Sequence, residues 1–294
     1  MYGYDVVMTA PVRIASWNIA GREIAWRALA TDGALDLALL QEASPPPPGV
    51  VLETVPSDSE AWSTAGNTKR DFCTAIARFS GRVQLRRNGV ARVGERKNDE
   101  VGVSRPGTLA LAEATLPNGE TVTVGSMYGF WESPIGSKWI YADASVHRLI
   151  SDLSVLIGAQ RGHRILLAGD LNILHGYGED GSAYWAARYR TVFDRMEAIG
   201  LPFVGPQFPN GRRADPRPEE LPAGSNNVPT YRTSAGGVSR QLDYVFASRE
   251  LHDRLTVRAL NAPEEWGPSD HCRILIELAA RRASSTSPSR GRLV

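Results

Sequence analysis

Short runs of apolar residues recur along the chain, and turn-forming residues separate them. Runs of this length predict β-strands. Two of them, LDLALL at 35–40 and RILLA at 164–168, are almost wholly apolar, which is typical of strands in a sheet that is covered on both faces. The predicted strands are 11–18, 35–40, 72–79, 109–115, 121–128, 164–168, 241–247 and 273–278.

Three helices are predicted between these strands. Segments 144–160 and 184–199 repeat apolar residues with the ~3.6-residue period of an amphipathic α-helix. In these two segments the period is carried by Val146, Leu149, Ile150, Leu153 and Ile157, and by Val192, Phe193, Met196 and Ile199. Gly200 is expected to end the second of them. A shorter helix at 21–31 is stopped by Asp32 and Gly33.

Three segments lack a regular pattern. The prolines at 45–48 exclude a helix or a central strand, so residues 43–70 are predicted to be an irregular excursion. Segment 82–105 is a polar insert rich in arginine, and segment 202–229, which holds seven prolines, is predicted to be a long loop. Loops of that length are commonly functional.

Hairpin-like strands and strands separated by helices occur in the same chain, which predicts an α/β fold built on mixed sheets with covering helices. No internal repeat or break in composition divides the chain. We therefore predict one domain at 11–279, preceded by an N-terminal extension at 1–10 and followed by a disordered basic tail at 280–294.

Membrane insertion and disulfide stapling are both disfavoured. No run approaches the ~20 apolar residues that a membrane-spanning helix requires, and the first eleven residues lack the pattern of an export signal. Cys73 and Cys272 are far apart and form no C-x-x-C pair, which argues against a disulfide framework or a structural zinc site. We expect a monomer in the reducing cytoplasm, without a membrane partner.

The charge is nearly balanced overall, with 33 basic and 32 acidic residues, but it is unevenly spread. The segment 281–294 carries four arginines and no acid, so the rest of the chain has a net charge of −3. Segment 82–97 holds six basic residues against the single acid Glu95. This insert could follow a phosphate backbone, or it could be a solvated loop in a chain that prefers arginine to lysine.

Polar residues gather where the predicted buried strands end. These residues are Asn18, Glu42, Tyr128, Asp170, Asn172, Asp243, Asp270 and His271. Strand ends that meet at one edge of a sheet can converge on a single cleft. Charged groups in such places are costly unless they are paired or bound to a metal.

Glu42 follows an apolar strand, where it is either a surface cap or an oxygen ligand for a divalent cation. The five histidines form no H-x-x-x-H pair and there is no cysteine cluster. Oxygen donors then point to Mg²⁺ or Mn²⁺ rather than zinc.

Asp170 and Asn172 lie two positions apart after a buried strand, so in extended chain they share a face. A carboxylate that accepts a proton from water, beside an amide that donates to a developing oxyanion, suits phosphoester hydrolysis, although a plain turn would also explain the pattern. Asp243 lies within a predicted strand and needs a partner. With His271 it would form an imidazolium that holds a phosphate oxygen.

Together these segments resemble the endonuclease/exonuclease/phosphatase superfamily, the magnesium-dependent phosphoesterases that include DNase I, exonuclease III and the AP endonucleases. The matching motifs, in the family's order, are SWN at 16–18, LQE at 40–42, GDLN at 169–172, QLDYV at 241–245 and SDH at 269–271. The resemblance implies a four-layer α/β sandwich with its site at one edge of two packed sheets.

The resemblance also implies roles for the matching residues. Glu42 would be the main ligand of Mg²⁺ or Mn²⁺, with Asp270 nearby. Asp170 would orient or deprotonate the attacking water, Asn172 would stabilise the transition state, and Asn18 would position Asp170 and the metal-bound water.

Asp243 would support His271 on the phosphate. Tyr128 ends a strand where DNase I, the sphingomyelinases and the inositol-phosphate phosphatases usually carry a histidine, so the chain is most similar to the exonuclease III and AP-endonuclease branch. The departures from that branch are Ala20, Ser44 and Trp131, which stand where it has polar residues.

The expected reaction is metal-dependent hydrolysis of a phosphodiester in DNA or RNA. The alternatives are a phosphatase or phosphodiesterase of a small molecule or lipid, and a non-catalytic binding protein on the same fold. Candidate substrate-contacting residues are Arg232, Trp131 and His175. Trp131 could stack on a base, whereas Trp185, which opens a predicted helix, is expected in the core and His175 could also be a plain loop residue.

Overall fold

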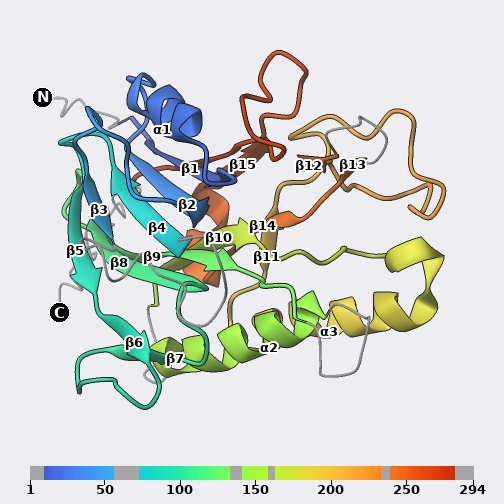
Figure 1. Ribbon diagram of the computed structural model, residues 1–294, viewed down its shortest axis with the longest axis horizontal. Coiled ribbons are helices and arrows are strands. Elements are labelled where there is room, and N and C mark those ends of the chain that lie inside the picture. The colour runs from blue at the N-terminus through green and yellow to red at the C-terminus, as the bar shows by residue number, and fades with distance from the viewer. Residues whose placement is uncertain (1–9, 56–72, 133–140, 158–162, 234–238, 282–294) are drawn as a thin grey trace, which may run out of the picture.

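The computed structural model describes residues 10–55, 73–132, 141–157, 163–233 and 239–281. Two six-stranded sheets form its centre (Figure 1). The first has the order β15-β16-β1-β2-β4-β3, with β1 at Val12–Asn18, β2 at Leu37–Ala43, β3 at Glu53–Val55, β4 at Cys73–Arg78, β15 at Leu255–Ala259 and β16 at Ile274–Leu278. The second has the order β11-β14-β10-β9-β8-β5, with β5 at Gln84–Asn88, β8 at Leu109–Thr115, β9 at Thr121–Tyr128, β10 at Ile165–Asp170, β11 at Phe203–Gly205 and β14 at Asp243–Ala247.

Both sheets are mixed, because β1 runs parallel to β2 and β9 runs parallel to β10, whereas the other pairs are antiparallel. Two small ribbons stand apart from them. They are β6 (Val90–Arg92) with β7 (Val101–Val103), and β12 (Tyr231–Arg232) with β13 (Ser239–Arg240).

Helices cover the outer face of each sheet. Helix α1 (Glu23–Ala30) lies on the first sheet, and α2 (Ala142–Leu153) and α3 (Ala183–Ala198) lie on the second (Figure 1). Short 3₁₀ turns are η2 (Ser154–Ile157), η3 (Glu179–Gly181) and η4 (Arg249–Arg254). The predicted four-layer α/β sandwich is thereby confirmed.

Alternation of side chains along the strands supplies three apolar layers. Ile14 and Leu39 face the interior between the two sheets. Trp17 and Leu40, on the opposite faces of the same strands, pack toward α1. Leu167 faces α2 and α3 from the second sheet.

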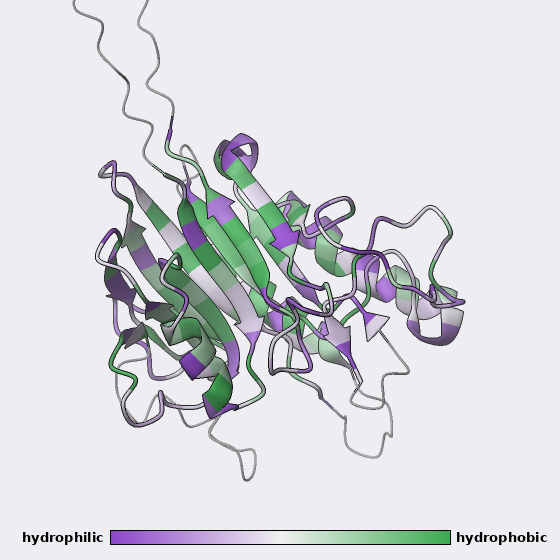
Figure 2. Ribbon diagram, turned by 90° about the horizontal axis from the view of Figure 1, so that it is seen from above, coloured by the Kyte–Doolittle hydropathy of each residue, from purple (hydrophilic) through white to green (hydrophobic). Residues whose placement is uncertain are grey.

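The interior between the sheets changes from apolar to polar toward the ends of these strands. Ile14 gives way to buried Ser16 and then to buried Asn18 along β1. Gln41 of β2 donates a hydrogen bond across the interior to the Ser126 hydroxyl of β9 at 2.9 Å. Figure 2 shows the apolar bodies of the strands in green and the polar strand ends and loops in purple.

The predicted strands and helices are present, but the four strands of the two small ribbons and four strands of the two large sheets were not predicted. The four in the large sheets share one feature. Strand β3 lies in the segment expected to be irregular, β5 in the polar insert, and β11 in the long loop, while β15 follows η4. All four are edge strands of the two sheets. Edge strands are short and carry polar residues, so no apolar run marks them.

Helix α2 ends earlier than expected, because residues 154–157 form η2. The predicted N-terminal extension, apart from residue 10, and most of the predicted basic tail lie outside the described residues. Among the described helices none is both long enough and apolar enough to cross a membrane.

Candidate functional site

A cleft of about 660 Å³ opens at the ends of the central strands of both sheets. Its lining includes Glu42, Asp170, Asn172, Asp270 and His271. Glu42 lies near the end of β2, Asp170 and Asn172 lie at and just after the end of β10, and Asp270 and His271 lie in the loop before β16. The fold therefore brings together predicted strand-end residues that are far apart in the chain.

Glu42 is held by side chains from both sheets. Its Oε1 accepts hydrogen bonds from Asn18 Nδ2 at 3.1 Å and from the Tyr128 hydroxyl at 2.9 Å. Burial, followed by the negative charge of Glu42, raises the pKa of the Tyr128 phenol well above its usual value. Tyr128 therefore stays neutral and serves as a fixed donor to the carboxylate.

Asn18 connects Glu42 to Asp170. Its Nδ2 donates to Asp170 Oδ2 at 2.9 Å, and its Oδ1 accepts from the Ala20 backbone N–H at 2.9 Å. Three residues of this cleft have left-handed backbone conformations, with φ of 49° at Ala20, 47° at Glu42 and 53° at Asn172. Such strained conformations cluster at functional sites, where the surrounding structure maintains them.

Asn172 orients Asp170 rather than pointing an unused amide into the cleft. Its backbone N–H donates to Asp170 Oδ1 at 2.9 Å, while Nδ2 donates to Asp170 Oδ2 at 3.2 Å and to the Gly129 carbonyl at 3.0 Å. Gly169 allows β10 to approach β9, because a Cβ there would lie 1.8 Å from the Met127 carbonyl oxygen. The expected role of Asn172 in stabilising the transition state stays a prediction.

His271 lies between two buried carboxylates. Its Nδ1 is 2.8 Å from Asp243 Oδ2, and its Nε2 is 3.7 Å from Asp170 Oδ2. Burial alone lowers the pKa of His271, but the charges of Asp243 and Asp170 outweigh it and raise the pKa to about 10. The ring is therefore an imidazolium at neutral pH.

The pKa of Asp170 is raised in turn, mainly by burial. His271 opposes this rise, and Asp243 adds to it, so that the pKa reaches about 7. A carboxylate with that pKa exchanges a proton readily near neutrality.

The segment that carries His271 is anchored to β1. Trp17 Nε1 donates to the His271 carbonyl at 2.8 Å, and the Ser269 hydroxyl donates to the Asn18 carbonyl at 2.7 Å. These contacts place Asp270 and His271 beside Asn18 although the residues are about 250 positions apart in the sequence.

Two groups of side chains at the cleft could bind a metal ion. Asp170, Asp243 and His271 offer ligand atoms within 4.8 Å of one another. An imidazolium cannot bind a metal, however, and Asp243 is already engaged with His271. Glu42 and Asp270 fit a metal better, because both are partly exposed in the cleft and neither forms an ion pair within the described part of the chain.

The three predicted substrate-contacting residues lie in different places. Trp131 lines the cleft and is 53% exposed. Arg232 is exposed next to the cleft, with its guanidinium 4.5 Å from the centre of the Trp266 ring. His175 lies outside the cleft, since its ring packs against Phe193 at 4.5 Å and lines a separate cavity under α3.

The structure also bears on two other features that the sequence left open, Trp185 and the basic insert. Trp185 packs between the rings of Tyr141 and Tyr189, so it belongs to the packing of α2 and α3, as expected. In the basic insert, Arg82, Arg86 and Arg92 are ion-paired with nearby carboxylates, which favours the solvated-loop interpretation.

Sequence reasoning missed several polar residues of the cleft wall, and four of them are Arg22, Glu179, Tyr231 and Arg240. Arg240 donates to Glu179 Oε2 at 2.7 Å, and Tyr231 lies against His271 with a ring separation of 5.0 Å. Arg240 directly precedes the QLDYV motif and Arg22 follows SWN closely. Their closeness to a motif was the only sequence feature that could have pointed to Arg22 and Arg240. None of these four residues directly follows an apolar strand, which was the pattern used to find most of the other site residues.

Solved structures share this architecture. The endonuclease domain of TRAS1, a telomere-specific non-LTR retrotransposon, matches with a TM-score of 0.59 and 16% identity over 92% of this chain and 100% of that chain. The AP endonuclease LMAP from Leishmania major matches with a TM-score of 0.59 and 15% identity over 92% and 89% of the two chains. The catalytic domain of Xenopus laevis APE2 matches with a TM-score of 0.58 and 17% identity over 92% of this chain and 94% of that chain.

At such low identities these likenesses show the fold. A comparison with curated proteins gave no match. The sequence model of the endonuclease/exonuclease/phosphatase family, in contrast, matches residues 15–271, a span that holds Asn18, Glu42, Asp170 and His271. The chain therefore belongs to the endonuclease/exonuclease/phosphatase family and is a phosphoester hydrolase.

Proposed function

We propose that this chain is a divalent-metal-dependent phosphodiesterase that hydrolyses nucleic acid by in-line attack of water. The observation that carries the proposal is the division of the acidic groups in the cleft. Asp170 is buried against the His271 imidazolium, whereas Glu42 and Asp270 are partly exposed and free of ion pairs among the described residues.

Glu42 and Asp270 would hold Mg²⁺ or Mn²⁺, because these cations prefer carboxylate oxygens. The bound ion would act as a Lewis acid on the phosphoryl oxygen and neutralise charge on the leaving oxygen. Asn18 and Tyr128 hold Glu42 in place, since each donates to its Oε1.

Asp170 is the general base of the proposed reaction. It accepts a proton from water as the water oxygen attacks phosphorus, and the bond between phosphorus and the leaving oxygen breaks on the opposite side. The leaving oxygen departs as an alkoxide and takes up a proton from solvent, and Asp170 releases its proton to solvent afterwards, so the products are a phosphomonoester and a hydroxyl group. Asn18 and Asn172 orient both oxygens of Asp170, so the base needs no rearrangement before it accepts the proton.

His271 holds the phosphate during this step. Its Nδ1 is committed to Asp243, so Nε2 is the nitrogen that can donate to a phosphoryl oxygen. A charged donor that is already in position stabilises the negative charge of the transition state at little reorganisation cost.

Nucleic acid is the proposed substrate for two reasons. The cleft of about 660 Å³ is larger than a single phosphate needs, and exposed Trp131 on its wall offers a face on which a base can stack. The proteins that share this architecture include an endonuclease domain and AP endonucleases.

The test is a substrate panel with metal-free protein to which Mg²⁺ or Mn²⁺ is added back. Plasmid DNA, single-stranded DNA, RNA and an abasic duplex are compared with bis(p-nitrophenyl) phosphate and p-nitrophenyl phosphate. We expect metal-dependent cleavage of a nucleic acid and a loss of about 10³-fold or more in Asp170→Asn. Asp194→Asn is the control, because Asp194 is exposed on α3, away from the cleft.

Three results would contradict the proposal. Turnover of the monoester alone would indicate a phosphatase. Cleavage that persists in the presence of EDTA would exclude the metal. Full activity of Asp170→Asn would show that the base lies elsewhere.

A further inference from the structure

The arginines around the cleft differ in whether a carboxylate neutralises them. Arg240 in the cleft wall donates to Glu179 at 2.7 Å. Arg105, which lies over the Phe130 ring, is paired with Glu132, the residue after Trp131, at 3.0 Å. These two guanidinium groups already have an acidic partner, which lowers their attraction for an added anion.

Arg22 is different. It lines the cleft and is exposed, and its Nη1 donates to the Pro268 carbonyl at 2.7 Å. It forms no ion pair with any carboxylate of the described residues. A guanidinium carries five N–H donors, so this single bond to a neutral oxygen leaves both its charge and most of its donors available.

Arg232 has the same character on the neighbouring ribbon. Its side chain is exposed and stacks over the Trp266 ring at 4.5 Å, while its backbone N–H donates to the Asp270 carbonyl at 3.0 Å. It also lacks a carboxylate partner within the described ranges. Stacking fixes the position of a guanidinium plane without neutralising it.

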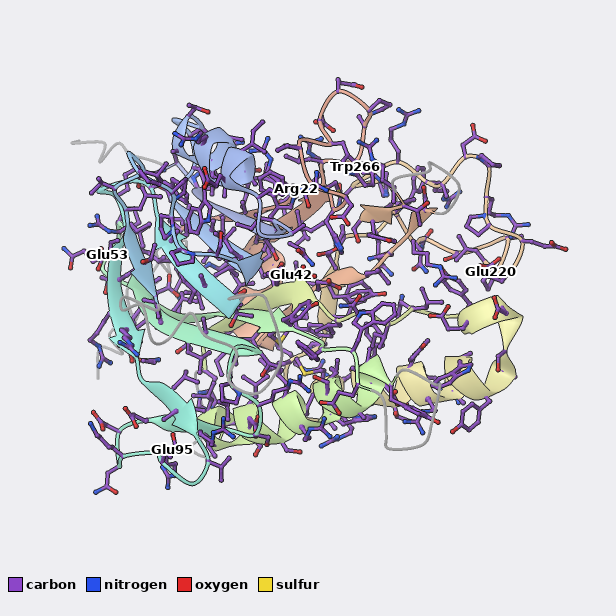
Figure 3. All side chains as sticks on the ribbon, viewed as in Figure 1. Arg22, Glu42, Glu53, Glu95, Glu220 and Trp266 are labelled. Carbon is purple, nitrogen blue, oxygen red and sulfur yellow. The ribbon has the colours of Figure 1, made fainter. Side chains whose placement is uncertain are left out.

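One loop, residues 266–271, holds both arginines and also supplies Asp270 and His271. Trp266 Nε1 donates to the Ser269 carbonyl at 3.1 Å, which braces the loop internally. Figure 3 shows Arg22 and Trp266 close together on the same side of Glu42. The two free charges are therefore tied to the proposed reaction centre by a short, braced segment.

We propose that Arg22 and Arg232 form a phosphate-binding subsite that takes the backbone phosphates adjacent to the scissile one. Guanidinium groups bind phosphate with two parallel hydrogen bonds. A polynucleotide supplies such neighbouring phosphates and a mononucleotide ester does not. The subsite would therefore favour a polynucleotide over a mononucleotide ester. This inference rests on the proposed nuclease function and specifies its substrate further.

The subsite also gives the cleft a polarity. Arg22 follows β1 of the first sheet, whereas Trp131 follows β9 of the second. Arg232 belongs to the ribbon β12-β13, but its guanidinium stacks on Trp266 in the segment between β15 and β16 of the first sheet. Both arginines are thus associated with the first sheet, and exposed Trp131 with the second. Backbone phosphates therefore run past the loop 266–271, and bases face the side of Trp131.

The test measures binding without catalysis. Fluorescence anisotropy of a labelled duplex oligonucleotide is recorded in EDTA over a salt series from about 50 to 200 mM. The variants are Arg22→Gln, Arg22→Lys and Arg232→Gln. Arg27→Gln is the matched control, because Arg27 is exposed on the adjoining helix α1 and already faces Glu23.

Arg22→Gln and Arg232→Gln should each weaken binding about 5-fold and reduce the slope of log K against log salt by about 1. Arg22→Lys should keep the wild-type slope because it keeps the charge, and Arg27→Gln should bind as the wild type does. Circular dichroism checks that each variant is folded.

Unchanged affinity and slope in both glutamine variants would overturn the subsite, as would a wild type that does not bind the oligonucleotide. Because the assay needs no metal and no turnover, arginine-dependent binding by a protein that cleaves no nucleic acid would refute the proposed function and leave the subsite standing.

Discussion

Replacing Asp243 with asparagine should lower the pKa of His271 by about 3. The Asp243 carboxylate lies 2.8 Å from Nδ1, and burial alone would lower the pKa. Two unit charges about 4 Å apart at an effective dielectric constant of about 20 interact by about 4 kcal/mol, and one pKa unit corresponds to about 1.36 kcal/mol. Asparagine keeps a hydrogen-bond acceptor for Nδ1 but removes the charge.

From about 10 in the wild type, the pKa of His271 should fall to about 7 in the variant. Asp170 at 3.7 Å prevents a larger fall. At pH 8 the wild-type ring is charged, whereas most variant molecules have a neutral ring that holds a phosphate oxygen less strongly. In a plot of activity against pH, the loss of activity at alkaline pH should therefore begin at a lower pH in the variant than in the wild type.

The assay is an NMR titration of metal-free protein labelled at histidine. Comparison with His271→Gln identifies the signal among the five histidines, and the other four serve as internal references. Asp194→Asn controls for the loss of a negative charge far from the ring. A wild-type His271 that titrates near 6.5, or a pKa that Asp243→Asn leaves unchanged, would refute the electrostatic argument.

Three further predictions concern metal binding and stability. Glu42→Gln should weaken binding of Mn²⁺ at least ~10-fold in calorimetry, and unaltered binding would place the metal elsewhere. Hydrogen bonding from Arg254 lowers the pKa of Glu120 below its ordinary 4.5. The ionised Glu120 carboxylate therefore stabilises the fold fully above pH 4.5, and this stabilisation is lost as the pH falls through the lowered pKa. Glu120→Gln should therefore cost about 2 kcal/mol in urea unfolding at pH 7, and a cost that did not shrink on acidification would contradict this. Gly267→Ala should destabilise by roughly 1 kcal/mol, because φ is 79° and the new Cβ would lie 3.4 Å from the Trp17 ring; an unchanged urea midpoint would show that the loop relaxes freely.

The central strands could be predicted because each is buried on both faces. Strand β10, for example, is buried at every position from Ile165 to Asp170, and burial of that kind requires an uninterrupted apolar run. The edge strand β5, with the sequence QLRRN, has only one hydrogen-bonded neighbour and is largely exposed. Its residues carry no apolar pattern, so sequence reasoning treated it as part of a loop.

The same contrast holds in the cleft. Asp170 and Asn172 were recognisable because they come directly after the apolar run of β10, and Glu42 because it comes at the end of the apolar run of β2. The contact between Asn172 and Asp170 is made through a left-handed backbone at Asn172, not through the extended chain that the sequence predicted. Arg22 and Arg240 were not recognisable, because whether a guanidinium is free or neutralised depends on partners such as Glu179 that are distant in the sequence. His175 looked like a candidate from its position near Asn172, but its ring turned toward Phe193.

The sequence by itself determined the alternation of apolar strands and helices, the order of the motifs and the chemical types gathered at the strand ends, since these follow from local periodicity and residue chemistry. Only the tertiary structure decided that Asn18 bridges Glu42 and Asp170, that His271 is charged between Asp243 and Asp170, and that Arg22 and Arg232 both contact the segment 266–271. The physical reason is that hydrogen bonds, burial and Coulomb interactions depend on distances in space, and these distances are set by the packing of two sheets whose strands come from both ends of the chain.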